Sequence, residues 1–424
     1  MNRRHFLQTT SAAALAAQAA AAASNAVIDE ARQTANALLK PSKRDLDYGL
    51  ALHADSVVFD SYGFSPRGAI DGARYAEAIR AGAGQLELQD LSESMAMTSP
   101  ATNEAERAEF AQAWKASGVT CIFQNAGEEG QDALRLVKRL AHFTHLMDMI
   151  PEIVRKAVRP EDVLAAKREG RSCLLFTGNG IPLTEAWQSV EDEFRYITIF
   201  YELGIRMMHI TYQRRNMLGD GCGETSDAGL SDFGRRAVAE LNRVGVIPDV
   251  AHSGRRTSLE TALASTKPAV ASHSVCADLN DHFRAKPDPV IRALADTGGY
   301  IGICCIPRFL GGKGDIGALL DHVDHVAKRF GADHVAIGTD VAYVSRNAAA
   351  ERAKAPPAPR TREHFRLLWP DDPFRETPEM VRSVAWTNWP MFTVGLVQRG
   401  YSDEDIRKII GGNVLRVLKA TAGS

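Results

Sequence analysis

The sequence lacks the features that mark nucleic-acid-binding, membrane-spanning and disulfide-stapled proteins. Its charges nearly cancel, with a formal net charge of −2 over 424 residues, and no basic stripe offers a surface for nucleic acid. The alanine-rich run that ends at Ala23 is too short and too weakly apolar for a permanent membrane span. The six cysteines show no CxxC spacing, and most lie in apolar runs, which favours buried free thiols.

The first residues are typical of an export signal. Arg3 and Arg4 precede Phe6 and a weakly apolar stretch, and small residues before position 24 offer a cleavage site. We therefore expect a twin-arginine signal over residues 1–23 and a periplasmic or otherwise exported protein. A lead-in segment over residues 24–49 and a single domain over residues 50–424 would follow.

Short apolar runs alternate with helical patterns along the rest of the chain. One helix is expected over residues 230–245, capped by Ser231 and stopped by Gly245. Eight strands alternating with helices predict an α/β fold, a (β/α)8 TIM-type barrel of the metal-dependent hydrolase kind. The expected strands are residues 56–60, 119–125, 172–177, 205–212, 246–252, 268–274, 299–306 and 335–340.

Polar residues at the ends of these strands suggest hydrolytic chemistry. His252 and His273 end neighbouring strands, and Asp340 ends the eighth, so all three should meet at one mouth of the barrel. Two imidazoles can bind Zn²⁺, Asp340 can transfer a proton, and Arg284 can pair with a substrate carboxylate. The loop over residues 345–377 follows the eighth strand and could act as a lid.

Several motifs resemble those of the membrane (renal) dipeptidase family, which consists of zinc-dependent barrel enzymes. The similarity runs from about residue 50 to the C-terminus. The matching motifs are Gly-Leu-Ser-Asp-Phe-Gly at 229–234, Leu-Asn-Arg-Val-Gly at 241–245, Asp-Val-Ala-His at 249–252, Ser-His-Ser at 272–274, Gly-Thr-Asp at 338–340 and Gly-Gly-Asn-Val-Leu-Arg-Val at 411–417.

The resemblance implies specific roles for four residues. His252 and His273 match the pair that binds the family's second zinc ion. Arg284 matches the arginine that holds the substrate carboxylate, and Asp340 matches the catalytic acid near the scissile nitrogen. Dimers occur among similar enzymes, so the resemblance leaves a homodimer open.

Other positions depart from the family pattern. Tyr62 and Phe64 replace the histidine and aspartate that bind the first zinc, and Thr177 replaces the glutamate that bridges the two metals. Tyr212 stands where a histidine contacts the substrate. Without the bridging anion the first metal site should be absent, which leaves one zinc ion or none. Tyrosine at two former functional positions suggests a repurposed pocket, with Tyr62 binding substrate and Tyr212 taking part in catalysis.

Two other histidines are expected outside the site. His209 lies three residues before Tyr212, which predicts that it faces the helices on the outer side of its strand. His53 precedes the first strand, which predicts a place at the opposite face of the barrel, as a surface or packing residue.

Three functions fit these residues. The leading one is a divergent dipeptidase-like hydrolase that acts on a small, carboxylate-bearing, peptide-like substrate with one metal or none. The alternatives are a periplasmic barrel recruited to the maturation of a peptide-derived metabolite and a catalytically inactive binding protein.

Overall fold

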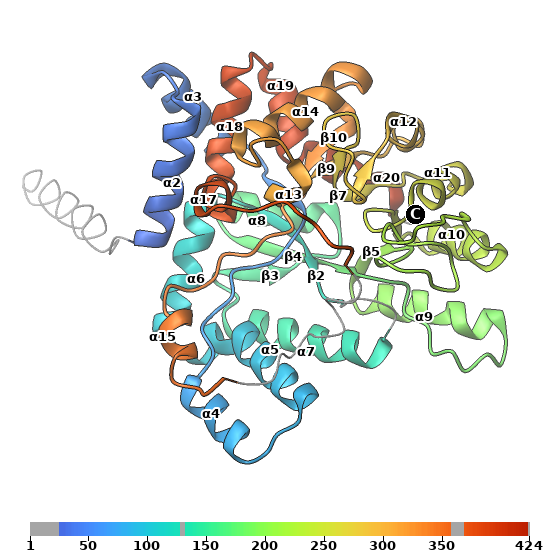
Figure 1. Cartoon of the computed structure of the whole chain (residues 1–424), viewed down its shortest axis with the longest axis horizontal. Coiled ribbons are helices and arrows are strands. Elements are labelled where there is room, and N and C mark those ends of the chain that lie inside the picture. The colour runs from blue at the N-terminus through green and yellow to red at the C-terminus, as the bar shows by residue number, and fades with distance from the viewer. Residues whose placement is uncertain (1–24, 128–131, 358–368, 423–424) are drawn as a thin grey trace, which may run out of the picture.

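In the described part of the chain, eight parallel strands form a barrel, as the sequence predicts. Figure 1 shows strands at the centre of the molecule with helices around them. The computed structural model describes residues 25–127, 132–357 and 369–422, so the predicted signal at 1–23 lies outside the described residues. Two short strands, β3 (Val154–Lys156) and β8 (Ala285–Lys286), pair with β4 and β7. The barrel strands are β1 (Phe59–Gly63), β2 (Cys121–Asn125), β4 (Ser172–Gly178), β5 (Ile205–His209), β6 (Ile247–Asp249), β7 (Ala271–Cys276), β9 (Ile301–Ile303) and β10 (Val335–Ile337).

Hydrogen bonds join two parallel sheets, β1-β2-β4-β5-β6 and β10-β9-β7, into a ring. The amide of Val250 donates to the carbonyl of Val270 at 2.8 Å and links β6 to β7. At the other seam, the amide of Asp340 donates to the carbonyl of Tyr62 at 3.0 Å and links the end of β10 to β1. Because the strands are parallel, their carboxyl ends share one mouth of the barrel.

Side chains alternate between the barrel interior and the surrounding helices. Cys121 and Phe123 of β2 pack inward with Leu175 of β4 and Met207 of β5, whereas Ile122 belongs to the outer apolar core. Helix α20 (Asn413–Thr421) adds apolar residues to the interior cluster. The side-chain amide of Asn413, the first residue of α20, donates to the carbonyl of Val335 at the start of β10. Helix α20 therefore closes the amino-terminal end of the barrel.

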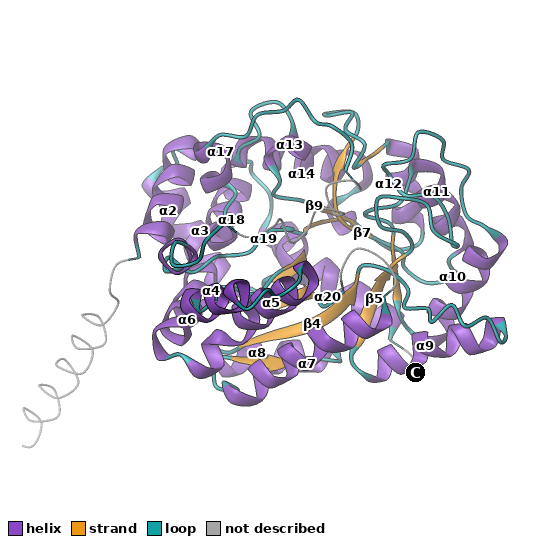
Figure 2. Ribbon diagram, turned by 60° about the horizontal axis from the view of Figure 1, so that its bottom comes forward, coloured by secondary structure: helices purple, strands orange, loops and turns teal. Residues whose placement is uncertain are grey.

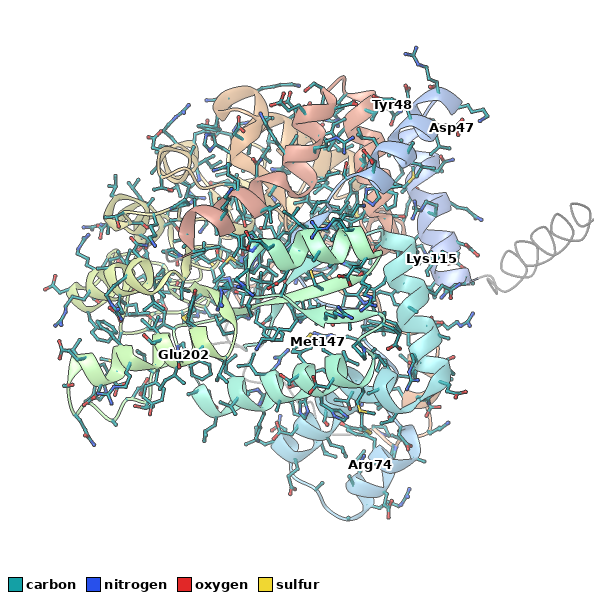
Figure 3. The ribbon with its side chains drawn as sticks, turned by 180° about the vertical axis from the view of Figure 1, so that it is seen from behind. Asp47, Tyr48, Arg74, Lys115, Met147 and Glu202 are labelled. Atoms are coloured by element: carbon teal, nitrogen blue, oxygen red, sulfur yellow. The ribbon has the colours of Figure 1, made fainter. Side chains whose placement is uncertain are left out.

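Helices surround the strands, and Figure 2 shows the strands enclosed by them. From behind, α3 with Asp47 and Tyr48 lies at the opposite end of the molecule from α4 with Arg74 (Figure 3). The other helices are α2 (Ala26–Leu39), α3 (Lys43–Asp55), α4 (Gly72–Arg80), α5 (Gln85–Thr102), α6 (Glu104–Ser117), α7 (Ala133–Met149), α8 (Pro160–Glu169), α9 (Val190–Glu202), α10 (Asp232–Val244), α11 (Arg255–Ala264), α12 (Asp288–Asp296), α13 (Pro307–Leu310), α14 (Ile316–Phe330), α15 (Ala348–Arg352), α17 (Pro378–Ser383), α18 (Trp389–Gln398) and α19 (Asp403–Arg407).

Several local predictions are confirmed. Ser231 caps α10 by accepting a hydrogen bond from the Gly234 amide, and Gly245 ends the helix with a positive φ of 96°. His53 is buried at the end of α3, before β1, as a packing residue. All six cysteines are buried free thiols. None of the helices in the described part of the chain is both long and apolar enough to cross a membrane.

Candidate functional site

Two histidines face each other at the carboxyl-terminal mouth of the barrel. The Nε2 atoms of His252 and His273 lie 3.0 Å apart, and both residues are buried. Each ring is covered by a tyrosine, because Tyr212 stacks on His252 at 4.1 Å and Tyr62 stacks on His273 at 3.7 Å between ring centroids. The structure therefore brings together both predicted metal ligands and both tyrosines that replace family residues.

Hydrogen bonds hold the far side of each imidazole. The Nδ1 atom of His252 lies 2.7 Å from Oε1 of Gln213, and Nδ1 of His273 lies 2.8 Å from Oγ of Ser272. Burial lowers the pKa of both histidines well below its ordinary value, and the positive charge of Arg284 acts in the same direction. Both rings are therefore neutral at pH 7, the form that binds metals.

A third histidine joins this pair, so the prediction that His209 packs under an outer helix is wrong. Strand β5 ends at His209 and does not reach Tyr212. Inward-facing Met207 lies two residues before His209, so alternation turns His209 into the barrel as well. Its ring lies edge-on to His252 and His273, with centroid distances of 5.3 and 5.5 Å.

A buried carboxylate, Asp249, lies behind the histidines. Its Oδ2 atom is 3.0 Å from Nε2 of His209 and also accepts a hydrogen bond from the Ser272 hydroxyl. Burial alone would raise the pKa of Asp249, but the amide and hydroxyl of Ser272, which both donate to its carboxylate, help to hold it below its usual value. Asp249 is therefore an anion at neutral pH, at the centre of the polar network.

Asp340 lies just past β10 in a strained backbone conformation. Its φ is +57°, in the left-handed region that non-glycine residues rarely adopt. Burial raises the pKa of its carboxyl to about 6, although Arg284 and Arg308 act in the opposite direction. A carboxyl with such a pKa can both take and give a proton near neutral pH.

A cavity of about 1010 Å³ lies over these residues. Its wall includes predicted site residues and, among many others, Arg308 and Trp369. The predicted site residues on the wall are Tyr62, Tyr212, His252 and Asp340. His273, buried beneath Tyr62, is not among the described residues that line the cavity. The cavity therefore meets the site from the side of His252 and Asp340.

Arg284 does not reach this wall in the described structure. Its side chain is fully buried, and its guanidinium donates to the carbonyls of Ala251 and His273 at 3.0 and 2.9 Å. Arg308 does line the cavity, with a side chain that is 40% exposed. The role of Arg284 as the residue that holds a substrate carboxylate therefore stays a prediction, whereas Arg308 is one of the arginines on the cavity wall.

A family model for membrane dipeptidases, peptidase family M19, matches residues 82–349, well over half of the chain. The chain belongs to the membrane dipeptidase family. Dipeptidase tcpJ of Claviceps purpurea is 28% identical over 282 residues, which cover 65% of this chain and 57% of that protein. Dipeptidase verJ of Clonostachys rogersoniana is 30% identical over 221 residues, 51% of this chain and 49% of that protein. The matches thus span about half the length of these relatives.

Solved structures of similar fold cover most of the chain. An amidohydrolase from Pseudomonas aeruginosa has a TM-score of 0.63 and 25% identity, covering 89% of this chain and 99% of its own. A metallo peptidase from Rhodobacter sphaeroides, liganded with a phosphinate mimic of the dipeptide L-Ala-D-Ala, has a TM-score of 0.60 and 18% identity, covering 87% and 100%. These likenesses support the barrel fold.

Members of the membrane dipeptidase family are zinc metallopeptidases, and the residues present fit one metal better than two. At the first-metal position, the hydroxyl of Tyr62 donates to Asn179 at 2.7 Å and its ring covers His273. Phe64 has no ligand atom. Thr177 supplies only a neutral hydroxyl, and its buried Oγ1 has no hydrogen-bond partner among the described residues. His252 and His273, by contrast, are neutral nitrogen donors that face each other.

Sequence reasoning missed the residues behind the histidines. Gln213, Asp249 and Ser272 orient the imidazoles or hold a charge beside them. Asp249 could have been found, because it lies two residues after inward-facing Ile247 on a short strand. Gln213 has no comparable signal in the sequence, since it lies outside the strands. Its own φ is positive, at 57°.

Proposed function

We propose that this chain is a hydrolase of small, carboxylate-bearing, peptide-like substrates that works with a single metal ion, Zn²⁺, held by His252 and His273. The observation that carries the proposal is the 3.0 Å approach of the two Nε2 atoms beneath a cavity whose wall includes Asp340. Neutral imidazoles with oriented Nδ1 atoms are the ligands that zinc prefers.

The reduced metal content follows from the first and third strands of the barrel. A pair of divalent cations about 3.5–4 Å apart needs a bridging anion. Thr177 cannot provide one, and Tyr62 and Phe64 leave the first cation without ligands. The stacking of Tyr62 on His273 further supports this proposal, because the ring takes up space on the side of the lost site.

Hydrolysis adds water across the amide bond: the carbonyl carbon gains a hydroxyl group and the departing nitrogen gains a proton. The metal, when bound, would supply a Lewis acid that polarises the substrate carbonyl. Asp340 would accept a proton from the attacking water and deliver it to the nitrogen, a task that suits its pKa of about 6. Tyr212 would hold His252 in place by stacking and contact the substrate from the cavity wall.

Arginine side chains on the cavity wall support a carboxylate-bearing substrate. Arg308 lies on the wall, and Arg284 lies behind it, where its guanidinium is 5.4 Å from the centre of the Phe309 ring. Arg308 lies 3.8 Å from Glu376, a separation at which an incoming carboxylate could compete for the guanidinium. We propose that Arg308 contacts the carboxylate and Arg284 adds to the potential.

The proposed site of action is the periplasm, because Arg3 and Arg4 precede an alanine-rich leader. Export of the full chain, and its loss on replacement of both arginines by lysine, tests this part.

The function is tested with free dipeptides and their C-terminal amides as substrates of zinc-loaded protein. We expect hydrolysis of the free dipeptides, a much lower kcat/KM for the amides, and loss of turnover in His252→Ala. A folded, zinc-loaded protein that binds dipeptides without cleaving them would contradict the proposal and favour the inactive binding protein. Cleavage of neither, with binding of larger peptide metabolites, would favour the maturation role.

A further inference from the structure

Three buried histidines, not two, meet inside the barrel. His209, His252 and His273 each offer one ring nitrogen, and these nitrogens all lie within 4.8 Å of one another. All three side chains are almost wholly buried. Two imidazoles make a weak zinc site, whereas three are a complete protein ligand set for a catalytic zinc ion.

The hydrogen bonds of His273 determine where its proton lies. The Ser272 hydroxyl donates to the carboxylate of Asp249, so its oxygen is left to accept from His273. The ring proton of neutral His273 therefore lies on Nδ1, and its Nε2 carries a lone pair.

The ring proton of His252 is also placed by its hydrogen-bond partner. Its Nδ1 lies 2.7 Å from the carbonyl oxygen of Gln213, which also accepts from the thiol of Cys222. The proton of His252 thus lies on Nδ1, and its Nε2 is also a lone-pair atom. Two lone pairs 3.0 Å apart repel each other unless a cation lies between them. Two nitrogens on one tetrahedral zinc ion would be about 3.3 Å apart.

His209 completes the pattern. Its Nδ1 lies 2.9 Å from the carbonyl oxygen of Gly178, which can only accept, so Nδ1 carries the proton. Its Nε2 lies 3.0 Å from Oδ2 of Asp249 without a well-aligned hydrogen bond to any described residue. A lone pair on Nε2 and the carboxylate oxygen repel each other at this distance, as the Nε2 atoms of His252 and His273 do, and a cation among the three nitrogens would relieve both contacts. All three histidines therefore donate from Nδ1 to a fixed oxygen and keep Nε2 for another partner, the arrangement found around metal-bound histidines.

We propose that His209 is the third ligand of a mononuclear metal site with His252 and His273, and that it replaces the bridging carboxylate lost at Thr177. The inference rests on the proposed function in so far as the metal is shared. The nitrogen-only ligand set selects Zn²⁺ over Mg²⁺ or Ca²⁺, which prefer oxygen ligands. Asp249, held through Ser272, supplies negative charge next to the three ligands without binding the metal.

X-ray absorption of the zinc-loaded full chain counts the imidazoles directly. We expect three histidine nitrogens at about 2.0–2.1 Å from the zinc ion. Because wild-type protein is used, the count does not depend on whether a variant folds. Two imidazoles would overturn the assignment of His209 while leaving a metal on His252 and His273.

Zinc affinity of His209→Gln, measured by chelator competition, gives the second test. We expect the affinity to fall by about 100-fold or more, and Gln213→Leu to weaken it by about 10–100-fold through His252. His322→Gln is the matched control, since His322 is buried but bonded through both ring nitrogens to backbone groups. It should leave zinc affinity unchanged.

The outcomes separate this inference from the proposed function. Unchanged affinity in His209→Gln, with affinity lost in His273→Ala, would refute the third ligand but keep the two-histidine metal site. Three imidazoles around zinc in a protein that cleaves no dipeptide would uphold the site and refute the hydrolase. A wild-type chain that binds no zinc would refute both.

Discussion

The Nε2 atoms of His252 and His273 face each other at 3.0 Å, although the residues come from different strands and are 21 positions apart. The distance follows from the barrel, because the backbone hydrogen bonds of Val270 with Pro248 and Val250 set β6 and β7 side by side. It is too short for two uncompensated lone pairs and close to the spacing on a shared metal ion.

Removing the carboxylate of Asp340 should abolish proton transfer without preventing the substrate from binding in the cavity. We expect Asp340→Asn to lower kcat by about 100-fold or more, with a small change in KM. In the wild type, the rate should fall as the pH drops below about 6, because Asp340 must be ionised to accept a proton. Steady-state kinetics across pH 5–8 check both expectations.

Asp47→Asn, on the far surface in α3, is the control for this experiment. If Asp340→Asn kept the wild-type rate and the same fall below pH 6, another group would carry the proton.

Restoring the family ligands should restore the second metal. We expect the triple variant Tyr62→His, Phe64→Asp, Thr177→Glu to bind two zinc ions per chain. The introduced glutamate can bridge the two cations, and the introduced histidine and aspartate can bind the cation of the first site. Tyr62→His alone should stay at one. Elemental analysis of both variants tests this, and two ions in the single variant would mean that the bridging carboxylate is not needed.

Arg308 should matter only for substrates with a free carboxylate. Replacing it by alanine removes a positive charge from the cavity wall, so KM for free dipeptides should rise by about tenfold. KM for the C-terminal amides should not change. Arg375 is exposed, and Arg375→Ala serves as the control variant. An equal rise in KM for both substrate types would show that Arg308 contributes to the shape of the cavity and not to recognition of the substrate's charge.

His53 should make stability depend on pH. Its Nε2 donates to the Ser117 carbonyl and its Nδ1 accepts from the Thr393 hydroxyl, both at 2.8 Å. Burial lowers the pKa of His53 to about 4, below about 6.5 in the unfolded chain. The unfolded state therefore binds more protons between these values, and stability falls as the pH drops through this window, by on the order of 3 kcal/mol.

Urea unfolding of wild type and His53→Gln at pH 7.5 and pH 5 measures this term. The variant should lose less stability on acidification than the wild type, and His334→Gln, a partly exposed histidine, should behave as the wild type does. Equal losses in wild type and His53→Gln would contradict the assignment.

The barrel could be predicted because its signals are local. Each strand is a short apolar run, and helix ends such as Ser231 and Gly245 are marked by their own chemistry. The pairing of His252 with His273 followed from the same pattern, since parallel strands bring their carboxyl ends together. Asp340, at the end of the eighth strand, followed from the same pattern, and the resemblance to the family added its role as the catalytic acid.

Other parts of the site depend on where strands stop, which periodicity does not fix. Expecting β5 to continue to Tyr212 turned His209 the wrong way, whereas the strand ends at His209 itself. On β1, the irregular register between Asp60 and Gly63 turns Tyr62 onto His273. Arg284 was expected to contact the substrate, but it donates to the backbone carbonyls of Ala251 and His273, which hold its side chain inside the fold. These are tertiary contacts that the sequence does not mark.

Zinc content per chain is the most direct test of the central claim, a single-metal site at the mouth of a dipeptidase-family barrel. Elemental mass spectrometry of the purified full chain, after zinc loading and removal of excess metal, should give one ion per wild-type chain and none in His273→Ala. Two ions per chain would contradict the loss of the first site, and none under any loading would contradict the metal-dependent account altogether.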